Sequence, residues 1–138
     1  MKYAAILIDT SAFVAYYNRA DKSHSLVYKF FSECESQLIT PTTCMTETMW
    51  MLRFDHRVQN AFLSTFGAGI YIHEPLINPD LQRIAELNEK YADRKADFAD
   101  LSLIAISERL DIPAIATLDK DFQVYRRYRN QPFVNVLS

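Results

Sequence analysis

The stretch AAILIDTSAF, residues 4–13, decides the fold because it ends an apolar run on a carboxylate. Five apolar residues lead directly into Asp9, and two hydroxyl residues, Thr10 and Ser11, follow it. An unbroken apolar run of this length is typical of a strand buried on both faces of a parallel sheet. Ligands of such sheets bind beyond the carboxyl ends of the strands. We therefore expect Asp9 to project from the strand end into the natural binding site of the fold.

Strand-like and helix-like segments alternate along the rest of the chain. The expected strands cover residues 3–8, 37–40, 70–75, 113–117 and 132–137. The expected helices cover residues 11–19, 23–36, 41–54, 56–66, 78–92, 97–110 and 119–128. Pro41 marks the start of one helix, and Asn78 is the expected N-cap of another. This order predicts an α/β fold in which a central, mostly parallel sheet carries helices on both faces.

The composition limits the possible functions. The length of 138 residues suits one domain, and a hydrophobic content of 49% is enough for a sizeable core. Two glycines argue against Gly-rich phosphate loops, and a net charge of −2 means that bulk charge does not recruit nucleic acid. Cys34 and Cys44 are not spaced as a metal-binding pair, and no secretory or membrane-spanning segment is recognisable. We expect a cytoplasmic protein with reduced thiols and no membrane association.

Several carboxylates stand in apolar surroundings. Asp9 and Asp119 each fall just past an expected strand, Glu47 interrupts a largely uncharged helix, and Asp97 and Asp100 share one face of another helix. Carboxylates brought together repel one another unless a cation compensates their charge. Hard oxygen ligands suit Mg²⁺ or Mn²⁺, which can activate water against a phosphodiester.

Each of these acids also has a purely structural interpretation. Asp9 could cap the following helix with Ser11. Asp97 is better explained as a favourable negative charge at a helix N-terminus than as a ligand. Asp119 could form a turn. Glu47 could face solvent, although the neighbouring sequence MWML, residues 49–52, predicts a mostly buried helix. The combined pattern is more specific than any single position.

The motifs LIDTSAFVAYYNRAD, TPTTCMTET, DFADLSLIAISERL and IATLDKDF follow one another in this order. With this spacing the chain resembles the PIN-domain ribonucleases, and among them the VapC-type toxins of toxin–antitoxin pairs. The resemblance implies a single PIN-like nuclease domain over residues 1–138 and a Mg²⁺- or Mn²⁺-dependent endoribonuclease. It maps the acidic quartet of the family onto Asp9, Glu47, Asp100 and Asp119, with Asp97 as an additional acid. It assigns supporting hydroxyls to Thr10, Ser11 and Thr117.

The residue types suggest which acids would bind the metal directly and which would complete its coordination shell. Asp9 and Asp100 are the best candidates for direct metal ligation, while Glu47 and Asp119 would complete the shell and orient the attacking water. No histidine base is required, and we interpret His24 as structural. As in the family, the products would carry a 5′-phosphate and a 3′-hydroxyl.

Possible contacts to RNA and to protein partners are less specific. A basic segment with interleaved tyrosines follows Asp119. It predicts RNA contacts at Lys120, Tyr125, Arg126, Arg127 and Arg129. The aromatic segments FVAYYNR and VYKFF cannot all be core, which suggests a surface for a second copy or for an antitoxin. We expect a homodimer with a cognate antitoxin.

Three other functions compete with a toxin. Aspartyl-phosphate phosphatases also place an acid after the first strand, but they want a second acid two residues later, where this chain has Ser11. An inactive RNA-binding domain predicts the loss of one of the four acids, and none is missing. A PIN-fold RNA-processing nuclease without an antitoxin stays open.

Overall fold

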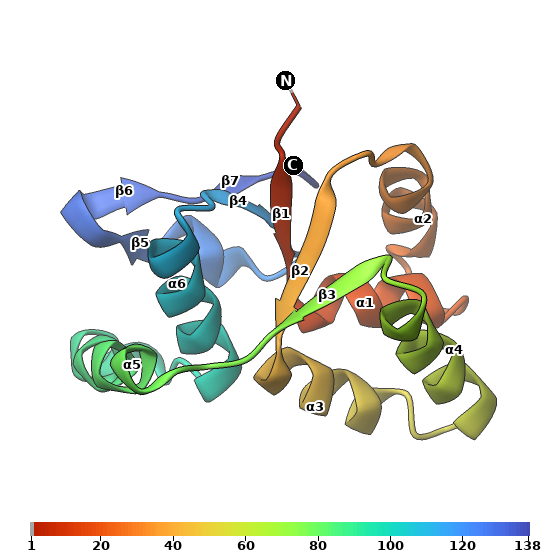
Figure 1. The fold of residues 1–138 in the computed structure, drawn as a ribbon, viewed down its shortest axis with the longest axis horizontal. Coiled ribbons are helices and arrows are strands. Elements are labelled where there is room, and N and C mark those ends of the chain that lie inside the picture. Colours follow the sequence, from red (N-terminus) through yellow and green to blue (C-terminus); the bar gives the residue numbers. More distant parts are fainter. Residues whose placement is uncertain (1) are drawn as a thin grey trace.

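A parallel five-stranded sheet forms the centre of the molecule in a computed structural model that describes residues 2–138 (Figure 1). The strand order is β3-β2-β1-β4-β7, and every neighbouring pair is parallel. The strands are β1 (Ala5–Ile8), β2 (Gln37–Pro41), β3 (Tyr71–Glu74), β4 (Ala114–Ala116) and β7 (Val134–Asn135). The predicted α/β class is thus confirmed. Met1 of the expected domain lies outside the described residues.

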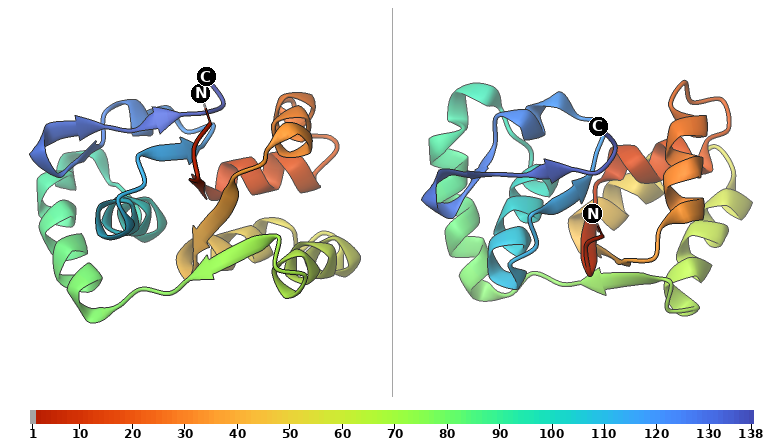
Figure 2. Two further views of the ribbon diagram at one scale, coloured as in Figure 1. Left: turned by 45° about the horizontal axis from the view of Figure 1, so that its top comes forward. Right: turned by 90° about the horizontal axis from the view of Figure 1, so that it is seen from above.

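Helices cover both faces of the sheet, as predicted (Figures 1 and 2). One face carries α1 (Thr10–Tyr17), α2 (His24–Glu33) and α4 (His56–Gly67). The other face carries α5 (Asn78–Lys90) and α6 (Phe98–Leu110). The remaining helix, α3 (Thr42–Met51), lies beyond the carboxyl end of β2 and contacts both α1 and α6. No helix within residues 2–138 is long and apolar enough to cross a membrane.

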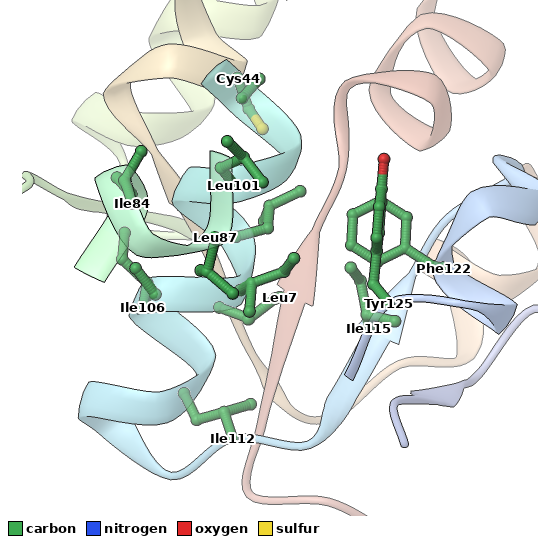
Figure 3. Close-up of a cluster of buried hydrophobic side chains, with 14 of the residues drawn as sticks. Leu7, Cys44, Ile84, Leu87, Leu101, Ile106, Ile112, Ile115, Phe122 and Tyr125 are labelled. Carbon is green, nitrogen blue, oxygen red and sulfur yellow. The ribbon is translucent and has the colours of Figure 1, made fainter. Parts of the chain in front are cut away.

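The side chains of β1 alternate between two separate cores. Leu7 packs with the α5–α6 side, in the cluster that Figure 3 shows, whereas Ile6 and Ile8 pack with the aromatic residues of α1 and α4. All three are buried. Packing on both faces holds β1 rigidly, and the strand therefore delivers the next residue, Asp9, to a fixed position.

An aromatic cluster fills the core on the α1 face. The Phe13 ring lies 5.0 Å, between centroids, from both Phe62 and Tyr71. Of the two aromatic segments expected to be partly exposed, Phe13 is fully buried, while Tyr28 is 54% exposed. The segments therefore divide between core and surface, as predicted.

Three local predictions are wrong. Asn78 does not cap α5: Ile77 holds the N-cap position, and the Asp80 side chain accepts a hydrogen bond from the Ile77 N–H at 3.0 Å. The segment 49–52 is not all core, because only Leu52 is fully buried, while Trp50 is 63% and Met51 is 51% exposed.

The third correction concerns the helix expected over residues 119–128. Only a single 3₁₀ turn forms there, Lys120–Gln123. Beyond it, β5 (Arg126–Arg127) pairs antiparallel with β6 (Gln131–Pro132) in a separate small ribbon. The physical reason is that the Tyr125 and Arg127 side chains are drawn into the interior, which a continuous helix would not allow.

Candidate active site

The carboxyl ends of β1 and β4 open onto an acidic cavity of about 720 Å³. Its lining includes the carboxylates Asp9, Asp21, Glu47, Asp97, Asp100 and Asp119. Among the described residues that line it, Lys22 is the only one with a positive charge. The five acids predicted from the sequence therefore meet in one place, contributed by α1, α3, α6 and the loop after β4.

Asp9 is the most constrained of these acids, with a residue exposure of 4%. One carboxylate oxygen accepts a hydrogen bond from the Thr10 N–H at 2.8 Å, so Asp9 caps α1 as well as lining the cavity. The other oxygen accepts from the hydroxyls of Ser11 at 3.0 Å and Thr117 at 2.7 Å. Burial raises the pKa of Asp9, and the three donors oppose that rise.

Asp97 and Asp100 lie together at the start of α6. Asp97 lies at the helix N-terminus, as the structural interpretation predicted, where it is the N-cap and its side chain accepts from the Asp100 N–H at 2.8 Å. Asp100 is buried and accepts from the Tyr125 hydroxyl at 3.1 Å. Burial first, and then the negative charges of Asp97 and Asp9, raise the pKa of Asp100 to about 8.

Glu47 faces the cavity from α3, where its side chain accepts from the Thr10 hydroxyl at 2.8 Å. Burial, followed by the charges of Asp97 and Asp9, raises its pKa. Asp119 caps the 3₁₀ turn after β4 by accepting from the Asp121 N–H at 2.9 Å. Asp9 thus caps a helix and Asp119 caps a turn, as the structural interpretations predicted, and both also line the cavity.

The three predicted hydroxyls all contact these acids. Ser11 and Thr117 bind the same oxygen of Asp9, and Thr10 binds Glu47. Thr117 also accepts from the Asp119 N–H at 3.0 Å, which ties two of the acids to one hydroxyl. The hydroxyls therefore fix the orientation of the carboxylates.

Sequence reasoning missed the two other charged residues of the lining, Asp21 and Lys22. They precede His24 in the loop after α1. His24 is structural, as predicted, since its Nδ1 lies 2.8 Å from the Ala15 carbonyl oxygen. The missed signal was an acid and a lysine in the loop that directly follows the helix carrying Asp9 at its cap.

The RNA-binding set requires correction at two positions. Tyr125 is fully buried and bonded to Asp100, so it cannot stack on a base. Arg127 is 4% exposed, and it donates to the Ser107 hydroxyl at 2.6 Å and to Asp111 at 3.0 Å. Arg126 is half-buried and donates to backbone carbonyls of residues 123–125. Lys120 and Arg129 are exposed, and an RNA contact there stays a prediction.

The donor chemistry of the cavity fits a hard divalent cation. Its acids offer only carboxylate oxygens, and burial, together with the charges of neighbouring acids, raises the pKa of Asp9, Glu47 and Asp100. Within residues 2–138, however, no three His, Cys, Asp or Glu side chains are already gathered as a metal-binding group. A cation would therefore require small side-chain movements, for which Glu47 and Asp119 are the least buried members of the acidic quartet.

The double position of Asp97 gives a testable prediction. Asp97→Ala should lower the free energy of unfolding by about 1 kcal/mol, because it removes the cap of α6. Asp97→Asn should leave stability nearly unchanged, because asparagine caps equally well. Urea unfolding of both variants checks this, and an equal loss in both would exclude capping as the reason.

Known proteins resemble this chain in sequence and in structure. The sequence profile of the PIN domain family matches residues 6–128. Ribonuclease VapC26 of Mycobacterium tuberculosis (strain ATCC 25618 / H37Rv) is 23% identical over 117 residues, which cover 83% of this chain and 87% of that protein. The crystal structure of Mycobacterium tuberculosis VapC20, described as a sarcin–ricin loop cleaving toxin, superposes with a TM-score of 0.80 at 20% identity. It covers 86% of this chain and 93% of that one.

The matched residues include most of β1, the whole of α6, and the acids Asp9, Glu47, Asp100 and Asp119. The parallel five-stranded sheet agrees with that match. The chain belongs to the PIN domain family.

Proposed function

We propose that the protein is a Mg²⁺- or Mn²⁺-dependent endoribonuclease, the toxin of a toxin–antitoxin pair, with Asp9, Glu47, Asp100 and Asp119 as its catalytic acids. One observation carries the proposal. Four acids from separate segments of the chain line one cavity at the carboxyl ends of the strands, and burial and mutual repulsion raise the pKa of three of them. Raised pKa values of carboxylates that share one cavity are typical of functional sites.

Asp9 and Asp100 would hold the cation from the rigid strand end and the start of α6, and Glu47 and Asp119 would complete its shell. When bound, the cation supplies charge neutralisation and activation of water against a phosphodiester. The residues of the chain prepare the site for it. Thr10, Ser11 and Thr117 orient Glu47 and Asp9, and Tyr125 holds one oxygen of Asp100. Glu47, which faces the cavity from α3, would orient a water molecule.

The comparisons support RNA as the substrate, because one relative is named a ribonuclease and the structural neighbour a toxin that cleaves the sarcin–ricin loop. The same likeness supports a cognate antitoxin as partner. A homodimer and a cytoplasmic location are further parts of the proposal.

Metal removal tests the proposal directly. The purified protein should cleave single-stranded or loop RNA in Mg²⁺ or Mn²⁺ and leave 5′-phosphate and 3′-hydroxyl ends. EDTA should abolish cleavage, and an excess of Mg²⁺ should restore it. Gel analysis of end-labelled RNA reads both rate and end chemistry. Cleavage that persists in EDTA, or products with a 2′,3′-cyclic phosphate, would contradict the mechanism.

A further inference from the structure

Trp50 is the only tryptophan of the chain, and it stands exposed in the wall of the acidic cavity. It is 63% exposed, although large aromatic side chains normally bury most of their surface. It follows Glu47 by three residues on α3, so both side chains project from the same face of the helix. The ring is thus presented to whatever occupies the space beside the catalytic acids.

A neighbouring arginine fixes the orientation of this ring. The Arg53 guanidinium carbon lies 3.8 Å from the centroid of the Trp50 ring. Arg53 also donates to the Trp50 carbonyl oxygen at 2.8 Å, which ties it to the helix end. Cation–π contact at this distance restrains the indole and places a positive charge beside the ring.

The charges of the cavity restrict what can bind there. Six carboxylates face one lysine, so the phosphates of an RNA strand meet net repulsion across most of the lining. Contacts to uncharged parts of the strand must therefore contribute. The apolar lining residues Val14, Trp50, Met51 and Leu118 offer such contacts, and an aromatic face accepts any base.

We propose that Trp50 is a stacking platform for one base of the RNA strand, next to the scissile phosphodiester, and that Arg53 contacts the phosphate of the same nucleotide. The inference rests on the proposed nuclease function and adds the recognition element to it. A single-stranded or looped-out nucleotide is the occupant that fits, because only an unstacked base can reach an aromatic ring.

Trp50 is also the probe for its own test, since it is the only indole in the protein. Stopped-flow mixing of the parent protein with a single-stranded RNA hexanucleotide in Mg²⁺ should give saturable quenching of tryptophan fluorescence before turnover. A hexamer with abasic sugars keeps the phosphates but lacks the bases, and it should give little quenching. Anisotropy of a labelled end of the same RNA reports binding independently.

Variants separate stacking from simple apolar contact. Trp50→Leu should weaken RNA binding and lower kcat/KM by about 5- to 150-fold, the range expected for loss of one stacked base. Trp50→Phe keeps an aromatic face and should lose much less. Phe54→Leu is the matched control, because Phe54 is 59% exposed close to the end of the same helix but is not part of the cavity lining.

The outcomes distinguish the stacking role of Trp50 from the proposed nuclease function. RNA that binds by anisotropy without quenching Trp50, or binds to Trp50→Leu as to the parent, overturns stacking. A changed sedimentation coefficient of Trp50→Leu with unchanged RNA affinity also overturns it and assigns the ring to a protein interface. Quenching and base-dependent binding without cleavage would leave stacking intact while the nuclease function fails. Absence of any RNA binding by the parent overturns both.

Discussion

Asp100→Asn and Asp9→Asn are each expected to lower the rate of RNA cleavage by at least about 100-fold while the protein still folds. Asparagine keeps the shape of the side chain but removes the charge that a divalent cation requires. At Asp9 the hydrogen bonds can survive, because the amide oxygen can accept from the Thr10 N–H while the Ser11 and Thr117 hydroxyls rotate to accept from the amide nitrogen. Asparagine is also a good N-cap, so α1 should keep its start.

The measurement is paired, with cleavage and thermal melting recorded on the same preparations. Asp93→Asn serves as the control, since Asp93 is exposed and lies outside the cavity lining. It should cleave and melt as the parent does. If Asp9→Asn melts far below the parent, Asp9 is a structural cap, and its assignment as a catalytic acid fails.

In EDTA the protein should lose stability as the pH rises from 5 to 8, with a fall in Tm of about 5–10 °C. The pKa of Asp100 is about 8 in the folded protein against 3.8 as its ordinary value. Between these values the folded state holds a proton that the unfolded state has released, so the free energy of unfolding falls with pH. Asp9 and Glu47, whose pKa values are also raised, act in the same direction. The raised pKa corresponds to a loss of about 2 kcal/mol in the free energy of unfolding, after a discount for relaxation of the folded protein around the charged carboxylate. For a domain of this size, such a loss lowers the Tm by the amount given above.

Two additions sharpen this experiment. Asp100→Asn should flatten the pH dependence and melt above the parent at pH 8, whereas Asp93→Asn should follow the parent. Millimolar Mg²⁺ or Mn²⁺ at pH 8 should raise the Tm of the parent by binding the folded state alone. A parent Tm that rises between pH 5 and pH 8 in EDTA would show that the acids of the cavity do not repel one another as described.

The sheet could be predicted because each of its main strands has a short apolar sequence. Leu7 and its neighbours are buried on both faces, and this double burial produces the unbroken pattern. The acids of the cavity could be nominated because strand ends and helix starts in such a sheet converge at one edge. Asp9 directly follows the apolar run of β1, and Asp100 directly precedes the apolar run of α6.

The errors arose where distant contacts override the local pattern. Tyr125 and Arg127 look like surface residues in a basic segment, yet one reaches Asp100 and the other reaches Ser107 in the interior. Neither partner is close in sequence, so the local hydrophobic pattern cannot indicate these contacts. Trp50 is the opposite case, since an apolar residue is exposed there because α3 borders a cavity and not a packed neighbour.

Three of the acids share a feature whose electrical effect reaches beyond capping. Asp9, Asp97 and Asp119 each cap a helix or 3₁₀ turn by accepting a hydrogen bond from a backbone N–H, so three such starts converge on the cavity. Aligned peptide dipoles place a partial positive charge at the starts of α1 and α6, worth about 0.3–1 kcal/mol toward a neighbouring anion. The backbone thereby supplies fixed counter-charge where side chains supply only Lys22. Because it comes from peptide groups, no substitution that preserves the helices can remove it.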